Sequence, residues 1–229
     1  MNLIFDIGFN HGKFTGECFK KHPNVQVVAV EANPNLCNKS NTDNFILLNR
    51  VVSNTDNEYI DFYVEHGADG ISTASTNWIN NSQFAKGSKY MINPTHKWSD
   101  VIKVPSISLD TLIENYGTPE LIKIDVEGYE LTVLSGLSKK AKDICFEWSE
   151  EVYDDLEKII SHLQSIGYTQ FGAIGYFDDR DLEYDTVTHS DQGDPYLVYP
   201  DNFYTWEELN FIRFIKPERR VNYGMFFAK

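Results

Sequence analysis

The stretch Leu3-Ile4-Phe5-Asp6-Ile7-Gly8-Phe9-Asn10-His11-Gly12 begins the chain and decides its fold. An apolar run ends in Asp6, a turn with two glycines follows, and residues 12–22 carry apolar side chains at helical spacing. A strand, a turn and a helix in this order form the unit that holds a nucleotide-like ligand at the carboxyl end of a strand. Gly8 and Gly12 suit a tight loop under such a ligand, because glycine accepts a positive φ and allows close approach.

The polar residues of this loop predict the kind of ligand. A dinucleotide site reads G-x-G-x-x-G, because bare backbone approaches a pyrophosphate, whereas here Asp6 stands at the mouth of the loop. A carboxylate would repel phosphate and would suit a ligand with an ammonium group and a sulfonium. S-adenosylmethionine (SAM) carries both groups. We therefore predict that SAM is the cofactor and that it is bound by Asp6, Gly8, Asn10 and Gly12.

Glu31 supports the same prediction from the second strand. It closes the apolar run of residues 25–30, and an acid at that strand end can accept both ribose hydroxyls of a nucleoside. Ser53, which follows the predicted third strand, is assigned to the same cofactor site. In the alternative interpretation, the glycines only make a turn, Asp6 caps a helix, and Glu31 is a solvated strand end.

Composition and charge argue against nucleic acid and membranes as partners. The 229 residues suit one α/β domain, and 34 acidic against 20 basic residues give a net charge of −14. Nucleic acid and membranes are disfavoured as partners, because binding phosphates needs a surplus of Lys and Arg. The 3 cysteines lack metal-type spacing, which is typical of reduced thiols in a cytoplasmic protein. No apolar stretch is long enough to span a bilayer, and no signal peptide is expected.

Strands and helices alternate along the chain, which predicts an α/β fold with a mostly parallel, doubly wound sheet. Residues 58–65 alternate apolar and polar side chains and are expected to form an antiparallel or edge strand. The last strand, at residues 223–228, is expected to run antiparallel. Residues 66–100 have no regular period and mix small polar with aromatic residues. We interpret them as a substrate-side insertion in a single domain that spans residues 1–229.

The segment Leu121-Ile122-Lys123-Ile124-Asp125-Val126-Glu127-Gly128-Tyr129-Glu130 resembles the central signature of the FkbM family of SAM-dependent methyltransferases. The loop of residues 6–12 resembles the family as well, and residues 71–75 and 107–110 do so less specifically. The resemblance implies a Rossmann-like class I methyltransferase fold. It also implies O-methylation, often of sugar hydroxyls in glycans or secondary metabolites.

The resemblance further implies a role for each matching segment. The loop would hold the methionine part of SAM and Glu31 the ribose, while Asp125 and Glu127 would lie beside the methyl group. Either acid could be the base that takes the proton of an alcohol acceptor, or could anchor its hydroxyl. Glu127 could instead cap the following helix. His66 and His11 are alternative bases, because histidine titrates near neutral pH.

The candidate acceptor-binding residues are Ser72, Thr73, Glu147, Trp148 and Glu150. An aromatic face can stack on a pyranose while acids accept its hydroxyls, although Trp148 could equally be a core residue. No metal site is predicted, because no histidine joins the acids in sequence.

These features together predict a SAM-dependent O-methyltransferase that acts on a small hydroxylated acceptor, such as a sugar of a glycan or glycosylated metabolite. The sequence leaves two other classes open. One is a NAD(P)-type oxidoreductase on a similar sheet, against which Asp6 counts. The other is a non-catalytic module that keeps the fold to bind a partner.

Overall fold

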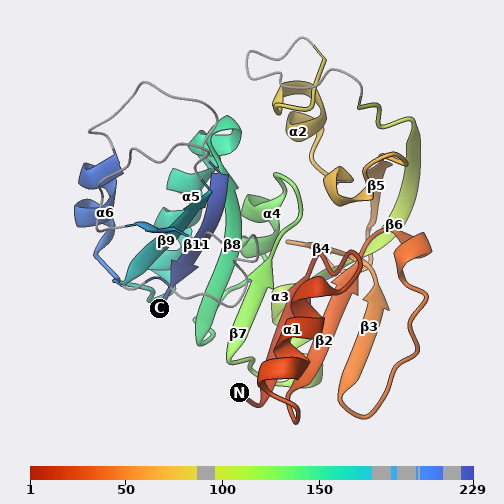
Figure 1. Ribbon diagram of the computed structural model, residues 1–229, viewed down its shortest axis with the longest axis horizontal. Helices are drawn as coiled ribbons and strands as arrows, with labels where there is room; N and C mark the ends of the chain where they lie inside the picture. Colours follow the sequence, from red (N-terminus) through yellow and green to blue (C-terminus); the bar gives the residue numbers. More distant parts are fainter. Residues whose placement is uncertain (87–95, 177–186, 190–199, 201, 214–222) are drawn as a thin grey trace.

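β1 (Leu3–Ile7) lies inside a sheet, with a parallel strand on each side. The computed structural model describes residues 1–86, 96–176, 187–189, 200, 202–213 and 223–229. Among these residues the main sheet has eight strands (Figure 1). Their spatial order is β10 (Val187–His189), β9 (Phe171–Tyr176), β11 (Tyr223–Ala228), β8 (Asp143–Ser149), β7 (Leu121–Ile124), β1, β2 (Gln26–Glu31) and β3 (Phe45–Asn49).

The strand directions confirm the expected mostly parallel, doubly wound sheet. The strand pairs are parallel except for those of β11, which runs antiparallel to both β8 and β9. The expected antiparallel last strand is therefore confirmed, and it lies between two other strands. Because β1, β2, β7 and β8 are parallel, their carboxyl ends meet at one edge, where ligands bind in such sheets.

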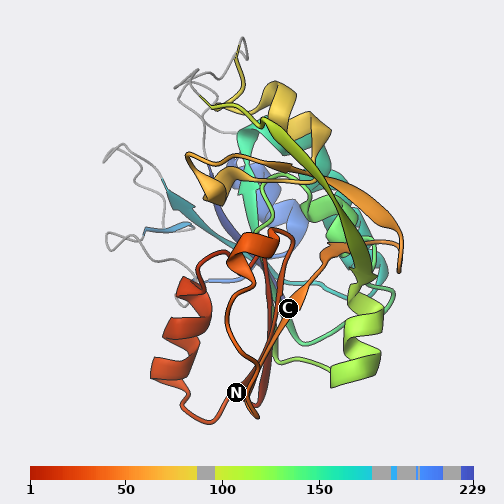
Figure 2. The ribbon, with the colours of Figure 1, turned by 90° about the vertical axis from the view of Figure 1, so that its right-hand side faces the viewer.

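Helices cover both faces of this sheet (Figure 2). α1 (Lys13–Lys21) lies on one face, where Phe14 and Cys18 pack against Ile4 and Val27. The other face carries α3 (Leu109–Tyr116), α4 (Glu130–Leu134), α5 (Tyr153–Ser165) and α6 (Trp206–Arg213). None of the helices in the described part of the chain has the length and apolar composition needed to cross a bilayer.

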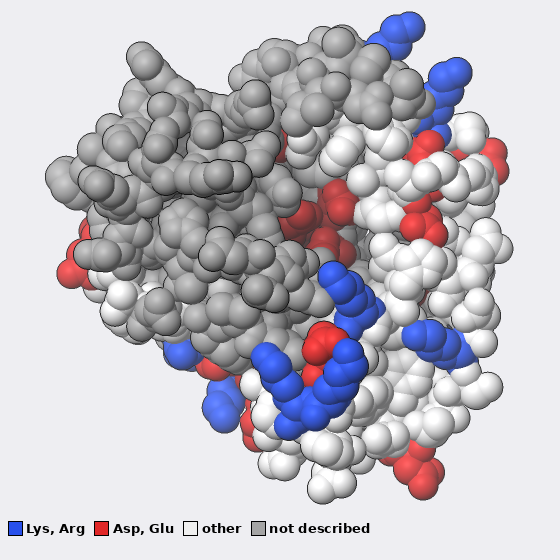
Figure 3. Space-filling view, viewed as in Figure 1, with Lys and Arg blue, Asp and Glu red and all other residues white. Residues whose placement is uncertain are grey.

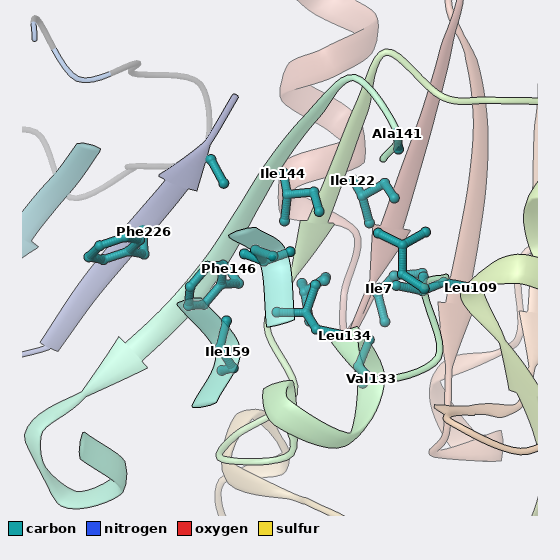
Figure 4. Close-up of a cluster of buried hydrophobic side chains, with 14 of the residues drawn as sticks. Ile7, Leu109, Ile122, Val133, Leu134, Ala141, Ile144, Phe146, Ile159 and Phe226 are labelled. Carbon is teal, nitrogen blue, oxygen red and sulfur yellow. The ribbon is translucent and has the colours of Figure 1, made fainter. Parts of the chain in front are cut away.

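The core between the sheet and α3–α6 explains why the central strands are apolar. Ile122 of β7 is fully buried there with Val133 and Leu134 of α4 (Figure 4). Ile124 of β7 belongs to the same cluster and is also fully buried. Each such side chain contributes roughly 1.5–3 kcal/mol through burial. Strands covered on both faces have few positions left for polar residues. The polar side chain of Lys123 inside β7 is therefore unusual.

A second, three-stranded sheet was not predicted. It consists of β4 (Val51–Ser53), β6 (Asp100–Ser108) and β5 (Tyr59–Val64), with β6 parallel to β4 and antiparallel to β5. The antiparallel strand expected at residues 58–65 is thus confirmed, but in this sheet. Arg50 alone separates β3 from β4, so the chain leaves the main sheet at that residue.

In the region expected to be an insertion, residues 66–86 and 96–100 are described, and they include two short helical segments, η2 (Asp69–Ile71) and α2 (Thr76–Asn81). Both lie beside the second sheet, on the side where the parallel strands of the main sheet end (Figure 1). Two further single turns are η1 (Pro34–Leu36) and η3 (Glu150–Val152).

Candidate cofactor and active site

A cavity of about 340 Å³ lies at the carboxyl ends of β1, β2 and β7. This volume is within the range of small-molecule sites. The main sheet lines one side, and Phe62 of β5 with residues 69–72 and 74 of the insertion lines the other. The predicted residues that line the cavity are Gly8, Asn10, Glu31, Ser72, Asp125 and Glu127. Figure 3 shows acidic side chains inside the hollow at the centre of the molecule.

The glycine loop has a backbone that only certain residues can adopt. Gly8 has a φ of 79°, and a Cβ atom at this position would lie 1.8 Å from the carbonyl oxygen of Asp125. Asn10 also has a positive φ, of 49°. Its Oδ1 is buried and has no hydrogen-bond partner among the described residues. Asn10 lines the cavity, which makes its side chain a candidate partner for a polar ligand.

Glu31 is fixed at the cavity by two backbone groups. Its Oε2 accepts the N–H of Asn10 at 2.7 Å, and its Oε1 accepts the N–H of Asn33 at 2.7 Å. The residue is 7% exposed, and burial raises the pKa of its carboxyl. It is therefore not a solvated strand end. Each carboxylate oxygen keeps a second lone pair, so Glu31 can still accept ribose hydroxyls.

Asp6 lies beneath the loop and is not among the residues that line the cavity. It is fully buried, and its Oδ2 accepts the hydroxyl of Thr15 at 2.6 Å. Its other oxygen lies 3.3 Å from the Nζ of Lys123, its partner across β1 and β7. The predicted contact of Asp6 with the cofactor is thus replaced by a structural ion pair under the cofactor loop.

Lys123 joins this ion pair to the cavity. Its Nζ donates to the carbonyl oxygen of Gly8 at 2.8 Å and lies 3.6 Å from Oδ2 of Asp125. Burial lowers the pKa of Lys123, but Asp6 and Asp125 outweigh this effect and raise it overall. The lysine is therefore charged, and it ties the cofactor loop to the end of β7.

Three carboxyl groups lie close together, and two of them, Asp125 and Glu127, line the cavity. Oxygens of Asp125, Glu127 and Glu147 all lie within 4.8 Å of one another. Burial, followed by the charge of Asp125, raises the pKa of Glu127 well above its ordinary value. Burial and the charge of Glu127 do the same for Glu147. Such a group can accept hydroxyls or a proton, and oxygens so close could also hold a divalent cation.

The turn that carries Glu127 does not use it as a helix cap. α4 begins at Glu130, whose Oε1 accepts the N–H of Val126 at 3.1 Å and that of Gly128 at 3.3 Å. Glu127 itself has a left-handed φ of 57°. The helix-cap interpretation of Glu127 is therefore wrong, and Glu130 holds the turn before the helix through two backbone N–H groups.

Several predicted residues lie away from the cavity. His66 is exposed and pairs with Asp100 at 2.6 Å, so it is not placed to act as the base. Ser53 is buried in the second sheet, with its hydroxyl 3.3 Å from Oδ1 of Asn54. Gly12 is the N-cap residue of α1, and a Cβ atom at this position would lie 2.4 Å from the ring of Phe9. None of the three predicted residues lines the cavity.

The predicted acceptor residues divide in the same way. Thr73 is fully buried, and its hydroxyl bonds backbone carbonyls of residues 126 and 127, so it cannot reach an acceptor. Trp148 packs against the main core. Glu147 points to the opposite face of the sheet, because neighbouring residues of a strand alternate between faces, and it lies against Asp125 and Glu127 without lining the cavity. Ser72 lines the cavity. The side chain of Glu150 lies outside the described residues.

Other residues that line the cavity were not predicted from the sequence. Arg50 comes from the junction of β3 and β4, Tyr129 from the turn before α4, and residues 69–71 from the insertion. Lys123 was within the recognised signature but was not assigned. A lysine inside the apolar run Leu121–Ile124 was the available signal, because a buried charge needs a partner.

The fold and this cavity define an α/β protein with a small-molecule site at the carboxyl ends of its parallel strands, lined in part by carboxyl groups. A model of the methyltransferase FkbM domain matches residues 6–169. The chain therefore belongs to the FkbM family of SAM-dependent methyltransferases, and its cofactor is SAM. The expected class I methyltransferase fold is confirmed. This assignment speaks against the oxidoreductase alternative.

Two solved methyltransferases are similar to the chain at low sequence identity. An FkbM methyltransferase from Methylobacillus flagellatus KT is 15% identical, with a TM-score of 0.48, over 78% of this chain and 41% of that one. Precorrin-6y C5,15-methyltransferase from Geobacter metallireducens GS-15 is 11% identical, with a TM-score of 0.43, over 100% and 78%. This chain thus spans less than half of the first structure. No curated protein matches the sequence significantly.

The cavity residues fit SAM. The unpartnered Oδ1 of Asn10 and the fixed carboxylate of Glu31 supply acceptors for the ammonium and hydroxyl donors of such a ligand. Gly8 and Asn10 lie on the side of β1, and Glu31 lies at the end of β2. This order corresponds to a ligand that extends along the edge of the sheet, as nucleotide-type ligands do in such folds.

Proposed function

We propose that the protein is an O-methyltransferase that transfers the methyl group of SAM to a hydroxyl of a small acceptor, such as a sugar of a glycan or glycosylated metabolite. The observation that carries this proposal is a group of three neighbouring carboxyls: Asp125 and Glu127 line the cofactor cavity, and Glu147 lies against them. An alcohol must lose its proton as the new bond forms, and a carboxyl with a raised pKa is a suitable general base.

Bound SAM supplies the methyl group, and the chain's own residues hold the reacting atoms in line. Glu31 would orient the ribose and the loop of residues 8–10 the methionine part. Much of the rate enhancement in such a displacement can come from alignment of acceptor oxygen, methyl carbon and sulfur. A fixed loop and a fixed carboxylate favour such alignment.

We assign the base to Glu127 and the anchoring of the acceptor to Glu147 and Asp125. The raised pKa of Glu127 favours uptake of a proton, whereas Asp125 is engaged in an ion pair with Lys123. Carboxylates that accept several hydroxyls suit a polyol such as a sugar. The net charge of −14 argues against a nucleic acid acceptor. The insertion of residues 66–100 would lie on the acceptor side.

A screen with methyl-labelled SAM tests this function. The wild type is incubated with a panel of sugars, glycosylated metabolites, amines and an RNA oligonucleotide, and each product is identified by mass spectrometry. We expect label only on hydroxyl oxygen. Glu127→Gln should retain SAM binding and lose about a hundredfold or more in turnover, because a general base contributes typically 10²–10⁴-fold. Label on nitrogen or RNA, or full turnover by Glu127→Gln, contradicts the proposal.

A further inference from the structure

Glu127 occupies a backbone conformation that its neighbours must enforce. Its φ of 57° lies in the left-handed region, where non-glycine residues are uncommon. Gly128, which follows it, has a φ of 81°. Residues held in such conformations persist only when surrounding contacts fix them, and they are frequent at functional sites. The contacts of this turn therefore determine where the carboxyl of Glu127 lies.

Two of these contacts act on the amide side of the turn. Glu130 accepts the N–H groups of Val126 and Gly128, as described above. Trp78 of α2 packs on Gly128 so closely that a Cβ atom there would lie 2.8 Å from Cε3 of the indole. Neither contact satisfies the carbonyl groups of the turn.

The carbonyl side of the turn is held by Thr73. Its Oγ1 donates to the carbonyl oxygen of Glu127 at 2.8 Å, lies 3.3 Å from that of Val126, and accepts the N–H of Ser75 at 2.8 Å. The residue is fully buried. Its own backbone pairs with Tyr63, through N–H···O distances of 3.0 and 2.8 Å, and this pairing anchors it to β5.

We propose that Thr73 is a positioning residue, whose hydroxyl fixes the turn so that the carboxyl of Glu127 lies against Asp125 and Glu147. The role of Glu127 as base rests on the function proposed above, but the positioning itself does not. Thr73 directly follows residues 69–72, which line the cofactor cavity. The same segment thus covers the cofactor site and holds the catalytic turn.

Two substitutions separate the hydroxyl from the shape of the side chain. Thr73→Val keeps the shape and removes the donor, whereas Thr73→Ser keeps the donor and removes a methyl group. Ser108→Ala is the matched control, because Ser108 is a buried residue whose hydroxyl caps α3 and bonds Asp56, away from the cavity. It therefore loses a buried hydroxyl without touching the turn.

Hydrogen exchange of the backbone amides of residues 126 and 128 is the measurement. In Thr73→Val we expect exchange faster by about tenfold to a hundredfold. The reason is that the carbonyl groups of the turn stay buried and lose their hydrogen bond, which makes opening of the turn easier by this factor. Thr73→Ser should restore protection, and Ser108→Ala should not change it even if its melting temperature falls. Unchanged protection in Thr73→Val, or loss of protection in Ser108→Ala, overturns the proposal.

With an acceptor in hand, a double-mutant cycle adds a catalytic readout. Thr73→Val should lower kcat in the wild type and have no further effect in Glu127→Gln, because Thr73 acts through Glu127. Equal losses in both backgrounds overturn this role. If Glu127→Gln is fully active while the exchange result holds, the proposed base is wrong and the positioning of the turn stands.

Discussion

Glu130 is a buried carboxyl that holds the turn of residues 126–128, and its titration can be followed through stability. Burial raises its pKa from 4.5 to about 7, against the lowering effect of the backbone N–H groups that it accepts. The folded state therefore binds a proton more tightly than the unfolded state. Its contribution to stability is largest below pH 4.5 and decreases as the pH rises from there to about 7.

Glu130→Gln should remove this pH dependence, because glutamine is neutral and its oxygen can still accept both N–H groups. We expect the variant to match the wild type near pH 4.5 and to be more stable above pH 7, by up to about 3 kcal/mol. Urea unfolding across this pH range measures the difference. A constant difference between the two proteins at all pH values would contradict the assigned titration.

Gly8 and Gly16 form a matched pair of glycines in the cofactor loop and in α1. Gly8→Ala should cost about 3 kcal/mol or more, because the methyl group meets the carbonyl of Asp125 at a positive φ. Gly16→Ala meets no atom within 4 Å and should stabilise α1 by about 0.5–1 kcal/mol. Thermal unfolding measures both. Equal effects would show that the loop is not constrained as described.

At the scale of the elements, a buried ion pair connects β1 and β7. Lys123→Met leaves Asp6 buried without its cation, which should cost about 3–5 kcal/mol. The double variant Asp6→Asn with Lys123→Met removes both charges and should recover much of this loss. Denaturant titration measures the three proteins. If the double variant is no more stable than the single one, the two residues are not coupled across the strands.

The elements also show what the sequence could predict. The strand, turn and helix of residues 3–22 were predictable because their signals are local. The second sheet was not predictable, because β6 pairs with β4 and β5, which are distant in sequence. A local sequence pattern does not show which strands pair with each other. The hydroxyl of Thr73 donates to the carbonyl oxygen of Glu127, which is 54 positions away. The sequence does not show this contact, so Thr73 was predicted to bind the acceptor. Alternation along β8 could have placed Trp148 on the face opposite to Glu147.

In the whole molecule, the main sheet forms one side of the cavity at the carboxyl ends of its parallel strands. Phe62 of the second sheet, with residues 69–72 and 74, forms the other side. Asp6 and Lys123 support the loop of residues 8–10 from below, Glu31 lines the cavity at the end of β2, and Asp125 and Glu127 line it after β7. The acids at the strand ends were recognisable in sequence. The sequence did not show that Asp6 is buried beneath the loop while Glu31 and Asp125 line the cavity, because burial depends on how the whole chain folds.

Calorimetric titration with SAM and with S-adenosylhomocysteine tests the central claim that this cavity binds the cofactor through Glu31. The wild type should bind both ligands, and Glu31→Ala should weaken them by about tenfold to a hundredfold, the loss expected for hydrogen bonds to a charged group. Glu114→Ala, an exposed acid of α3, is the control and should leave both affinities unchanged. A folded wild type that binds neither ligand, or a Glu31→Ala variant with undiminished affinity, would contradict the account.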